Sequence, residues 1–181
     1  MRMIALCMVV LAFFIFATSS FAEDITGRWA LGSRYNYVVV DDADFKNNGN
    51  SYGLNFTYGI SKHFALELEG DFFKVESKDN TKLVTYTLHS NMQLRKDVGV
   101  FTPYLVGGLG IQYFDYGILK VDDRKDKDVS FSYKLGGGIE YFCDQNWALN
   151  IEGAYVYGNT GGSATLDVYG WRYGGGVKYY F

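Results

Sequence analysis

Hydrophobic residues take every second position in residues 51–73. The apolar positions are Tyr52, Leu54, Phe56, Tyr58 and Ile60 and, after Ser61-Lys62-His63, Phe64, Leu66, Leu68 and Phe72. Between the last four stand Glu67, Glu69 and Asp71, three carboxylates on one side. Because successive side chains of a strand point to opposite faces, this pattern predicts two strands joined by a tight turn, each with one apolar and one polar face.

The same alternation recurs along the chain. It predicts eight strands, at about residues 26–38, 51–60, 64–73, 83–95, 103–114, 129–142, 147–157 and 167–181. The connections at 61–63, 96–102 and 143–146 are short, whereas those at 39–50, 74–82, 115–128 and 158–166 are longer and polar. This asymmetry is typical of a bacterial outer-membrane barrel. The predicted fold class is all-β: an eight-stranded antiparallel transmembrane β-barrel with short periplasmic turns, long extracellular loops and both termini on the periplasmic side.

The apolar face suits lipid, and the polar face suits a barrel interior. Strands of about 10–13 residues can cross a bilayer when tilted, and closure pairs every backbone polar group, as hydrocarbon requires. Eight strands leave an interior just wide enough for side chains, so charges there must pair. The predicted luminal charge network consists of Arg28, Arg34, Glu67, Glu69, Asp71, Arg95, Lys134, Glu140, Glu152, Arg172 and Lys178.

The periodicity also fits a water-soluble, lipocalin-like barrel, in which the apolar face would form the core. The aromatic content, the unequal connections and the aromatic C-terminus favour the membrane barrel. Within that barrel, the row Glu67, Glu69 and Asp71 fits either a salt-bridged plug or the lining of a cation path, and we favour the plug.

The first 22 residues have the features of a cleaved signal peptide. Arg2 precedes an apolar run over residues 4–17, and Ser20 and Ala22 fit the small-residue cleavage rule. The run is shorter than the ~20 residues of a spanning helix, and a retained amphipathic anchor is the alternative. We expect a signal peptide over residues 1–22 and one outer-membrane barrel domain over residues 23–181.

Composition narrows the function classes. Without Arg2 the chain has 16 basic and 20 acidic residues, a net charge of −4, which gives no reason to expect nucleic acid as a partner. Cys143 is the one cysteine outside the predicted signal peptide, so no internal disulfide can form. A free thiol in a periplasmic turn is favoured over a cross-link to a partner.

The C-terminus resembles the signal that outer-membrane barrels present to their assembly machinery. It ends on Phe181, with Tyr179 and Val177 at alternate positions before it. The stretches 102–110 (TPYLVGGLG), 133–142 (YKLGGGIEYF) and 146–152 (NWALNIE) are similar to the OmpA-like, porin-family β-barrel domain. The resemblance covers nearly all of residues 23–181. It implies an integral outer-membrane protein of the Gram-negative envelope, and little about activity, because such barrels host several functions.

Two motifs that suggest chemistry have simpler interpretations. Residues 136–138 and 174–176 are glycine triplets. A phosphate-binding loop would need a helix after it, whereas here a strand continues, so we expect glycines that make room for large luminal neighbours. Trp29, Trp147 and Trp171 could be recognition aromatics, but we expect them in the interfacial girdles.

His89 and Ser90 raise the question of a lipid A deacylase, which uses a Ser and a His on the lipid face of a barrel. The two residues are adjacent in sequence, so they point to opposite faces, His89 to the lumen and Ser90 to lipid. His63 and His89 are too far apart for a convincing metal site. We therefore expect no enzyme, no cofactor and no metal.

The expected role is structural or surface-interacting, as a monomer with outer membrane lipid and lipopolysaccharide around it. Loops carried on a rigid scaffold often bind ligands, so the expected contact surface is residues 39–50 and 115–128. A narrow channel for small or apolar solutes, as in OmpW-like barrels, is the second function, and a lipid A-modifying enzyme is the third.

Overall fold

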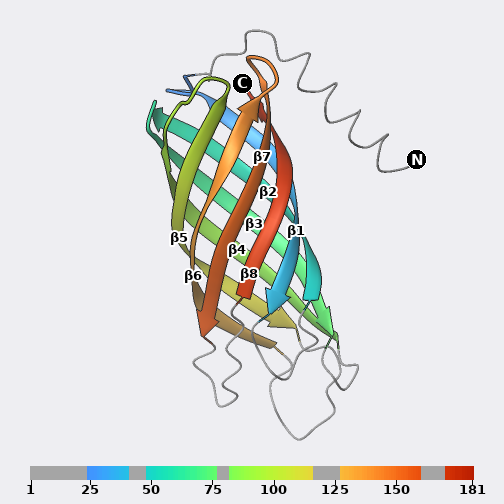
Figure 1. Cartoon of the computed structure of the whole chain (residues 1–181). Helices are drawn as coiled ribbons and strands as arrows, with labels where there is room; N and C mark the ends of the chain where they lie inside the picture. Colours follow the sequence, from blue (N-terminus) through green and yellow to red (C-terminus); the bar gives the residue numbers. More distant parts are fainter. Residues whose placement is uncertain (1–23, 41–47, 77–81, 116–126, 160–169) are drawn as a thin grey trace, which may run out of the picture.

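The chain forms a closed antiparallel barrel of eight strands in the order β1 to β8, with each strand next to its sequence neighbours and β8 paired back to β1 (Figure 1). The structure is a computed structural model and describes residues 24–40, 48–76, 82–115, 127–159 and 170–181. The strands are β1 Trp29–Val40, β2 Asn48–Ser61, β3 Phe64–Glu76, β4 Lys82–Arg95, β5 Phe101–Asp115, β6 Lys127–Phe142, β7 Trp147–Asn159 and β8 Gly170–Tyr180. The predicted fold class is confirmed.

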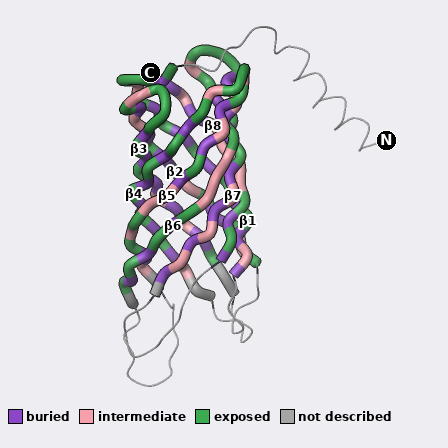
Figure 2. Tube along the Cα trace, turned by 60° about the vertical axis from the view of Figure 1, so that its left-hand side comes forward, coloured by how far each residue is buried: buried purple, intermediate pink, exposed green. Residues whose placement is uncertain are grey.

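Burial alternates along the described parts of the strands, except at the glycine triplets, where it is intermediate throughout (Figure 2). On the outer face, Leu54, Leu105 and Ile151 are each more than 60% exposed, whereas the inward-facing Gln93 and Lys178 are fully buried. The apolar face therefore points outward and the polar face points into the barrel. This polarity suits lipid outside and is the reverse of the water-soluble alternative, which is wrong. Among the described residues no helix is long and apolar enough to cross a membrane.

The tight turns and the C-terminus share one end of the barrel (top in Figure 1). At the β2–β3 turn, Ser61 Oγ accepts hydrogen bonds from the backbone N–H groups of His63 and Phe64. At the β6–β7 turn, Asp144 Oδ1 accepts from the N–H groups of Asn146 and Trp147 at 2.8 and 2.7 Å. Such side-chain acceptors replace the missing ladder bonds of a sharp reversal.

The first strand begins later than the predicted residue 26. Gly27 has a φ of 75°, and the N–H of Arg28 donates to the Ile25 carbonyl at 2.9 Å, so the chain turns here before β1 begins. The turn places Ile25 inside the barrel, 1% exposed. The predicted start of the last strand, at residues 167–169, lies outside the described residues.

Inward-facing glycines make room for polar side chains on the neighbouring strands. A Cβ on Gly53 would come within 2.1 Å of an Asp71 carboxylate oxygen, and one on Gly110 within 2.6 Å of the His89 ring. The first and third glycines of each predicted triplet behave in the same way: a Cβ on Gly138 would lie 2.4 Å from the Ile151 carbonyl oxygen and 2.5 Å from Tyr104 Oη. These glycines leave the narrow interior enough volume for its polar contents.

Two glycine substitutions give a matched test of this role. Gly138→Ala should destabilise the folded barrel by about 1–3 kcal/mol, because the added methyl group collides with backbone. Gly70→Ala should change the stability little, since the nearest atom to a Cβ on the outward-facing Gly70 is 3.9 Å away. Urea unfolding in lipid, followed by tryptophan fluorescence, measures both. Equal effects of the two substitutions would contradict the explanation.

Candidate functional site: an ionic network in the lumen

Among the described residues, ten charged side chains occupy the barrel interior, five acidic and five basic. They are Arg34, Glu67, Glu69, Asp71, Arg95, Lys134, Glu140, Glu152, Arg172 and Lys178, and Glu152 is the most exposed of them at 8%. Each sits at an inward position of its strand, as the alternation predicts. Every one of the ten lies within 4.0 Å of an opposite charge.

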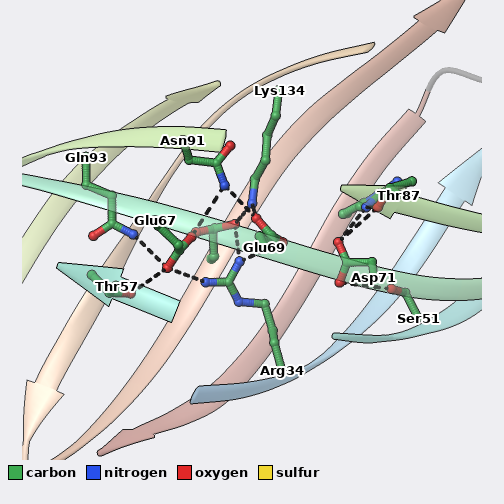
Figure 3. A network of polar contacts seen from close by, with 12 residues as sticks. Arg34, Ser51, Thr57, Glu67, Glu69, Asp71, Thr87, Asn91, Gln93 and Lys134 are labelled. Atoms are coloured by element: carbon green, nitrogen blue, oxygen red, sulfur yellow. Dashed lines mark hydrogen bonds and ion pairs between the residues drawn. The ribbon is translucent and has the colours of Figure 1, made fainter. Parts of the chain in front are cut away.

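Arg34 and Lys134 lie at the centre of the network, and each contacts more than one carboxylate (Figure 3). Arg34 Nη1 lies 3.1 Å from Glu69 and 2.7 Å from Glu152, and its Nη2 lies 3.8 Å from Glu67. Lys134 approaches the middle from β6 and pairs with Glu69 and, at 2.7 Å, with Glu152. Two cations therefore share three carboxylates: Glu67 and Glu69 of β3 and Glu152 of β7.

The network continues toward the tight-turn end. Lys178 Nζ lies 2.9 Å from Glu67 and 3.5 Å from Glu140. Arg95 pairs with Glu140, and the Tyr180 hydroxyl donates to the same carboxylate at 3.0 Å. Through Glu67 and Lys178 these contacts join the central group, so eight of the ten charges form one connected chain.

The remaining pair lies nearer the opposite end. Arg172 Nη1 is 2.9 Å from Asp71 Oδ2, and its guanidinium stands over the Phe73 ring at 5.1 Å. The hydroxyl of Thr87 also lies 3.5 Å from both groups. A cation–π contact and an ion pair together hold this arginine across the interior.

Neutral side chains complete the coordination of the carboxylates. Gln93 donates to Glu67 at 3.0 Å, Asn91 donates to Glu69 at 2.8 Å, and the Tyr104 hydroxyl donates to Glu152 at 3.0 Å. Buried ions need this additional hydrogen bonding because ion pairing alone rarely offsets their loss of water. Tyr104 and Tyr180 were not among the predicted residues, although both stand at inward positions of the alternation.

The two strands that close the barrel are tied to β3 from the inside. β1 supplies Arg34, and β8 supplies Arg172 and Lys178; these cations meet the three successive carboxylates of β3. β3 is not hydrogen-bonded to either strand. The ionic contacts therefore cross the interior and link the β1–β8 closure to β3, a strand that neither of them adjoins.

Apolar side chains lie at both ends of the lumen. Near the tight turns, Ile25, Phe142 and Tyr180 form a buried cluster with three alanines, and the Phe142 and Tyr180 rings are 5.3 Å apart. At the other end, Val38, Phe73 and Val156 are at most 3% exposed. The ionic network is thus bounded by hydrophobic residues above and below.

Arg28 differs in position from the other predicted luminal charges. It precedes β1 and is half-buried. Its guanidinium donates to the carbonyls of Tyr180 and Phe181, both at 3.3 Å, and lies 5.6 Å from the Tyr180 ring. The turn at Gly27 keeps Arg28 at the barrel end, where it contacts the C-terminus.

The predicted aromatic and C-terminal residues lie on the outer face. Trp29 and Trp147 begin β1 and β7 at the tight-turn end, whereas Trp171 lies at the other end, in β8. Tyr179 contacts the rings of Trp147 and Phe181, and Val177 is partly exposed two residues earlier. The Phe181 N–H donates to the Trp29 carbonyl at 2.8 Å, which ties the last residue to β1.

His89 and Ser90 face opposite sides, His89 fully buried and Ser90 exposed. His89 Nε2 instead lies 2.9 Å from Ser132 Oγ, on β6. Sequence reasoning missed this pair because His89 and Ser132 are brought together only across Gly110 of β5, which stands between them in the register. No group of three or more metal-ligating side chains occurs among the described residues.

The proposed contact surface is described only in part. Of residues 39–50, the structure describes 39–40 and 48–50, and residues 116–126 of the second loop lie outside the described ranges. Cys143 is an exposed free cysteine in the β6–β7 turn. Partial burial, and then the neighbouring Asp144 carboxylate, raises the pKa of its thiol.

Comparisons with known proteins agree with this architecture. The family model described as "Outer membrane protein beta-barrel domain" matches residues 8–181. Comparison with curated proteins gives no match. Among solved structures, Neisserial surface protein A has 15% identity and a TM-score of 0.69, covering 86% of this chain and 99% of that one. The outer membrane protein OprG of Pseudomonas aeruginosa has 17% identity and a TM-score of 0.64, covering 90% and 99%.

One structural neighbour is an enzyme. The outer membrane enzyme PagL has 12% identity and a TM-score of 0.52, covering 81% of this chain and 97% of that one. At such identities the likeness shows the fold alone, because one fold hosts many functions.

Removing one carboxylate of the network, while its cationic partners stay in place, should destabilise the barrel. Glu69→Gln leaves Arg34 and Lys134 sharing one carboxylate fewer and should cost about 3–5 kcal/mol. Lys62→Gln, which removes the exposed Lys62–Asp97 pair, should cost at most about 1 kcal/mol. Urea unfolding in lipid measures both. Adding Lys134→Met to Glu69→Gln should restore part of the loss, and a double variant less stable than Glu69→Gln alone would contradict the pairing.

The thiol of Cys143 should react slowly with iodoacetamide at neutral pH, because its raised pKa keeps the thiolate fraction low. The rate should rise about tenfold per pH unit. Asp144→Asn should speed alkylation at a fixed pH, since it removes a negative neighbour and keeps Oδ1 as the turn acceptor. Mass spectrometry in a Cys7→Ser background follows the reaction. An unchanged rate in Asp144→Asn would contradict the electrostatic contribution.

Proposed function

This chain belongs to the family of outer membrane protein β-barrel domains, and on that basis we propose that it is a structural or surface-interacting barrel whose packed interior does not conduct ions. It lies in the outer membrane, as its family and fold indicate. We propose further that residues 1–22 are a cleaved signal peptide and that the barrel works as a monomer.

The observation that supports a non-conducting interior is that every buried charge in the described part of the lumen has an oppositely charged partner. An ion crossing this lumen would have to separate pairs such as Arg34–Glu152 and Lys178–Glu67, at 2.7 and 2.9 Å. Separating buried partners leaves uncompensated charges inside the barrel, which is strongly destabilising. The apolar cluster around Ile25 and Phe142 adds a second barrier at one end.

A filled interior leaves the outside of the barrel to carry the function. Loops on a rigid scaffold are the usual place for binding, so we propose contact through residues 39–50 and 115–128. The similar Neisserial protein is, by name, a surface protein. We also propose that Val177, Tyr179 and Phe181 are read by the barrel assembly machinery and that lipopolysaccharide contacts the outer wall.

A narrow channel is the second candidate, because one set of observations favours it. Both amide atoms of Asn55 and Asn150 are buried without a hydrogen-bond partner in the protein. Water molecules satisfy such groups in most proteins, so parts of the lumen are suited to hold water. An enzymatic role has less support: Ser90 and His89 face apart, and the His89–Ser132 pair lies inside the barrel.

Planar-bilayer recording of the folded barrel tests the proposal. Folding is first checked by gel mobility with and without boiling. We expect no discrete current steps at voltages at which a porin conducts. Steps whose size changes in Glu69→Ala would identify the barrel as a channel. Steps of equal size in wild type and in Glu69→Ala would also contradict a closed interior, and a preparation from cells without the barrel controls for a contaminating porin.

A further inference from the structure

The chain ahead of β1 folds into the tight-turn end of the barrel. Ile25 lies inside this end, 1% exposed. It belongs to a buried apolar cluster whose other members are Ala30, Ala65, Phe142, Ala148 and Tyr180. We call residues 24–27 the stopper and the other members of the cluster its socket. Three of the socket residues are alanines, which leave room for one branched side chain.

Gly59 of β2 also makes room for the stopper. A Cβ on Gly59 would lie 2.0 Å from the Ile25 carbonyl oxygen and 3.0 Å from Ile25 Cγ1. Gly59 holds the same segment through its backbone, because its carbonyl accepts from the Gly27 N–H at 2.8 Å and its N–H donates to the Arg28 carbonyl at 3.0 Å. The mouth of the barrel is therefore fitted to Ile25 by β2 as well as by the socket.

The stopper has internal hydrogen bonds of its own and a glycine hinge. Asp24 Oδ1 accepts from the N–H and the hydroxyl of Thr26 at 3.0 and 2.6 Å. Gly27 has a φ of 75°, and a Cβ there would have nothing within 4 Å, so the turn stands clear of the barrel wall. Because Ile25 precedes Trp29, the first residue of β1, it can leave the socket without breaking a bond between strands. Such local opening is the usual behaviour of segments at chain ends.

The socket borders the ionic network. The Tyr180 hydroxyl donates to Glu140 Oε2 at 3.0 Å, and Ala148 is the register partner of Lys178. The other carboxylate oxygen, Glu140 Oε1, lies 3.5 Å from Lys178 Nζ and is buried without a hydrogen-bond partner in the protein. Water satisfies such oxygens in most proteins. The stopper lies on the periplasmic side of these groups.

We propose that the stopper is a hinged gate for water at the periplasmic end of the lumen. In the closed position, Ile25 keeps periplasmic water from Glu140 and Lys178. In the open position, the stopper turns out about Gly27 and admits water while the eight strands stay paired. Burial of one isoleucine favours the closed position by about ten- to a hundredfold. The inference deepens the proposed function and rests on its outer-membrane barrel with a filled lumen.

Two buried hydroxyl residues of β2 provide matched reporters of water access. Thr57 is in register with Ala30 of the socket, whereas Ser51 stands nearer the loops on the same strand. Both are fully buried, and their hydroxyls donate to carboxylates at 3.3 and 3.5 Å. Thr57→Cys and Ser51→Cys, each in a Cys7→Ser and Cys143→Ser background, are treated with methyl methanethiosulfonate. Mass spectrometry gives the labelling rate, and gel mobility shows that the labelled barrel is still folded.

Ile25→Ala should speed the labelling of Thr57→Cys at least about tenfold and leave that of Ser51→Cys unchanged. Ile25→Leu is the matched control, because it keeps the side-chain volume and should leave both rates as in wild type. No increase in Ile25→Ala, or an equal increase in Ile25→Leu, would overturn the proposal. So would an equal increase at Ser51→Cys, since the whole barrel would then have loosened.

The hinge is tested with a second pair of substitutions. Gly27 and Gly99 have φ angles of 75° and 65°, and a Cβ on either would have nothing within 4 Å. Alanine at either position adds backbone strain without a collision. Gly27→Ala strains the closed turn and should speed the labelling of Thr57→Cys about fivefold, whereas Gly99→Ala, between β4 and β5, should not. Equal rates in the two variants would overturn the hinge.

Labelling and planar-bilayer recording separate this inference from the proposed function. A barrel that conducts in wild type, but whose Thr57→Cys labelling depends on Ile25, would contradict the closed interior alone. A silent barrel whose Thr57→Cys labelling is the same with and without Ile25→Ala would contradict this inference alone. Gly27→Ala provides the same test if Ile25→Ala does not fold.

Discussion

The structure depends on the neutralisation of ten charges inside a barrel too narrow for bulk water. A buried ion without a partner costs several kcal/mol, so each inward carboxylate needs a cation at hydrogen-bonding distance. The barrel meets this requirement with equal numbers of acidic and basic groups, and eight of them form one chain from Arg95 to Lys134. The same charges therefore fill the lumen and stabilise the fold, and the proposal of a non-conducting interior rests on them.

The ionic network also explains features that look unrelated to it. Inward glycines such as Gly53 and Gly138 exist because Asp71 and Tyr104 occupy the space that a side chain would take. The closing strands β1 and β8 meet β3 through Arg34, Lys178 and Arg172, although β3 has no backbone bonds to either. Charge pairing thus supplements the hydrogen bonds of the β1–β8 closure.

With the interior filled, the function moves to the outside of the barrel. The outer wall is apolar and rich in aromatic residues, as lipid requires. The loops remain the proposed surface for macromolecular contact, so lipid and surface partners would meet different parts of the same barrel.

The sequence alone determined the strands, the two faces and the residues that point inward, because a period of two is a local property of each strand. It could also place His89 and Ser90 on opposite faces. It could not pair Arg34 with Glu152, 118 positions away, or His89 with Ser132, because those contacts depend on closure and on the register between strands. The turn that sends Ile25 into the lumen and the separate position of Arg28 were likewise decided only in three dimensions. They arise where side chains from several strands share one space, which no single strand's pattern records.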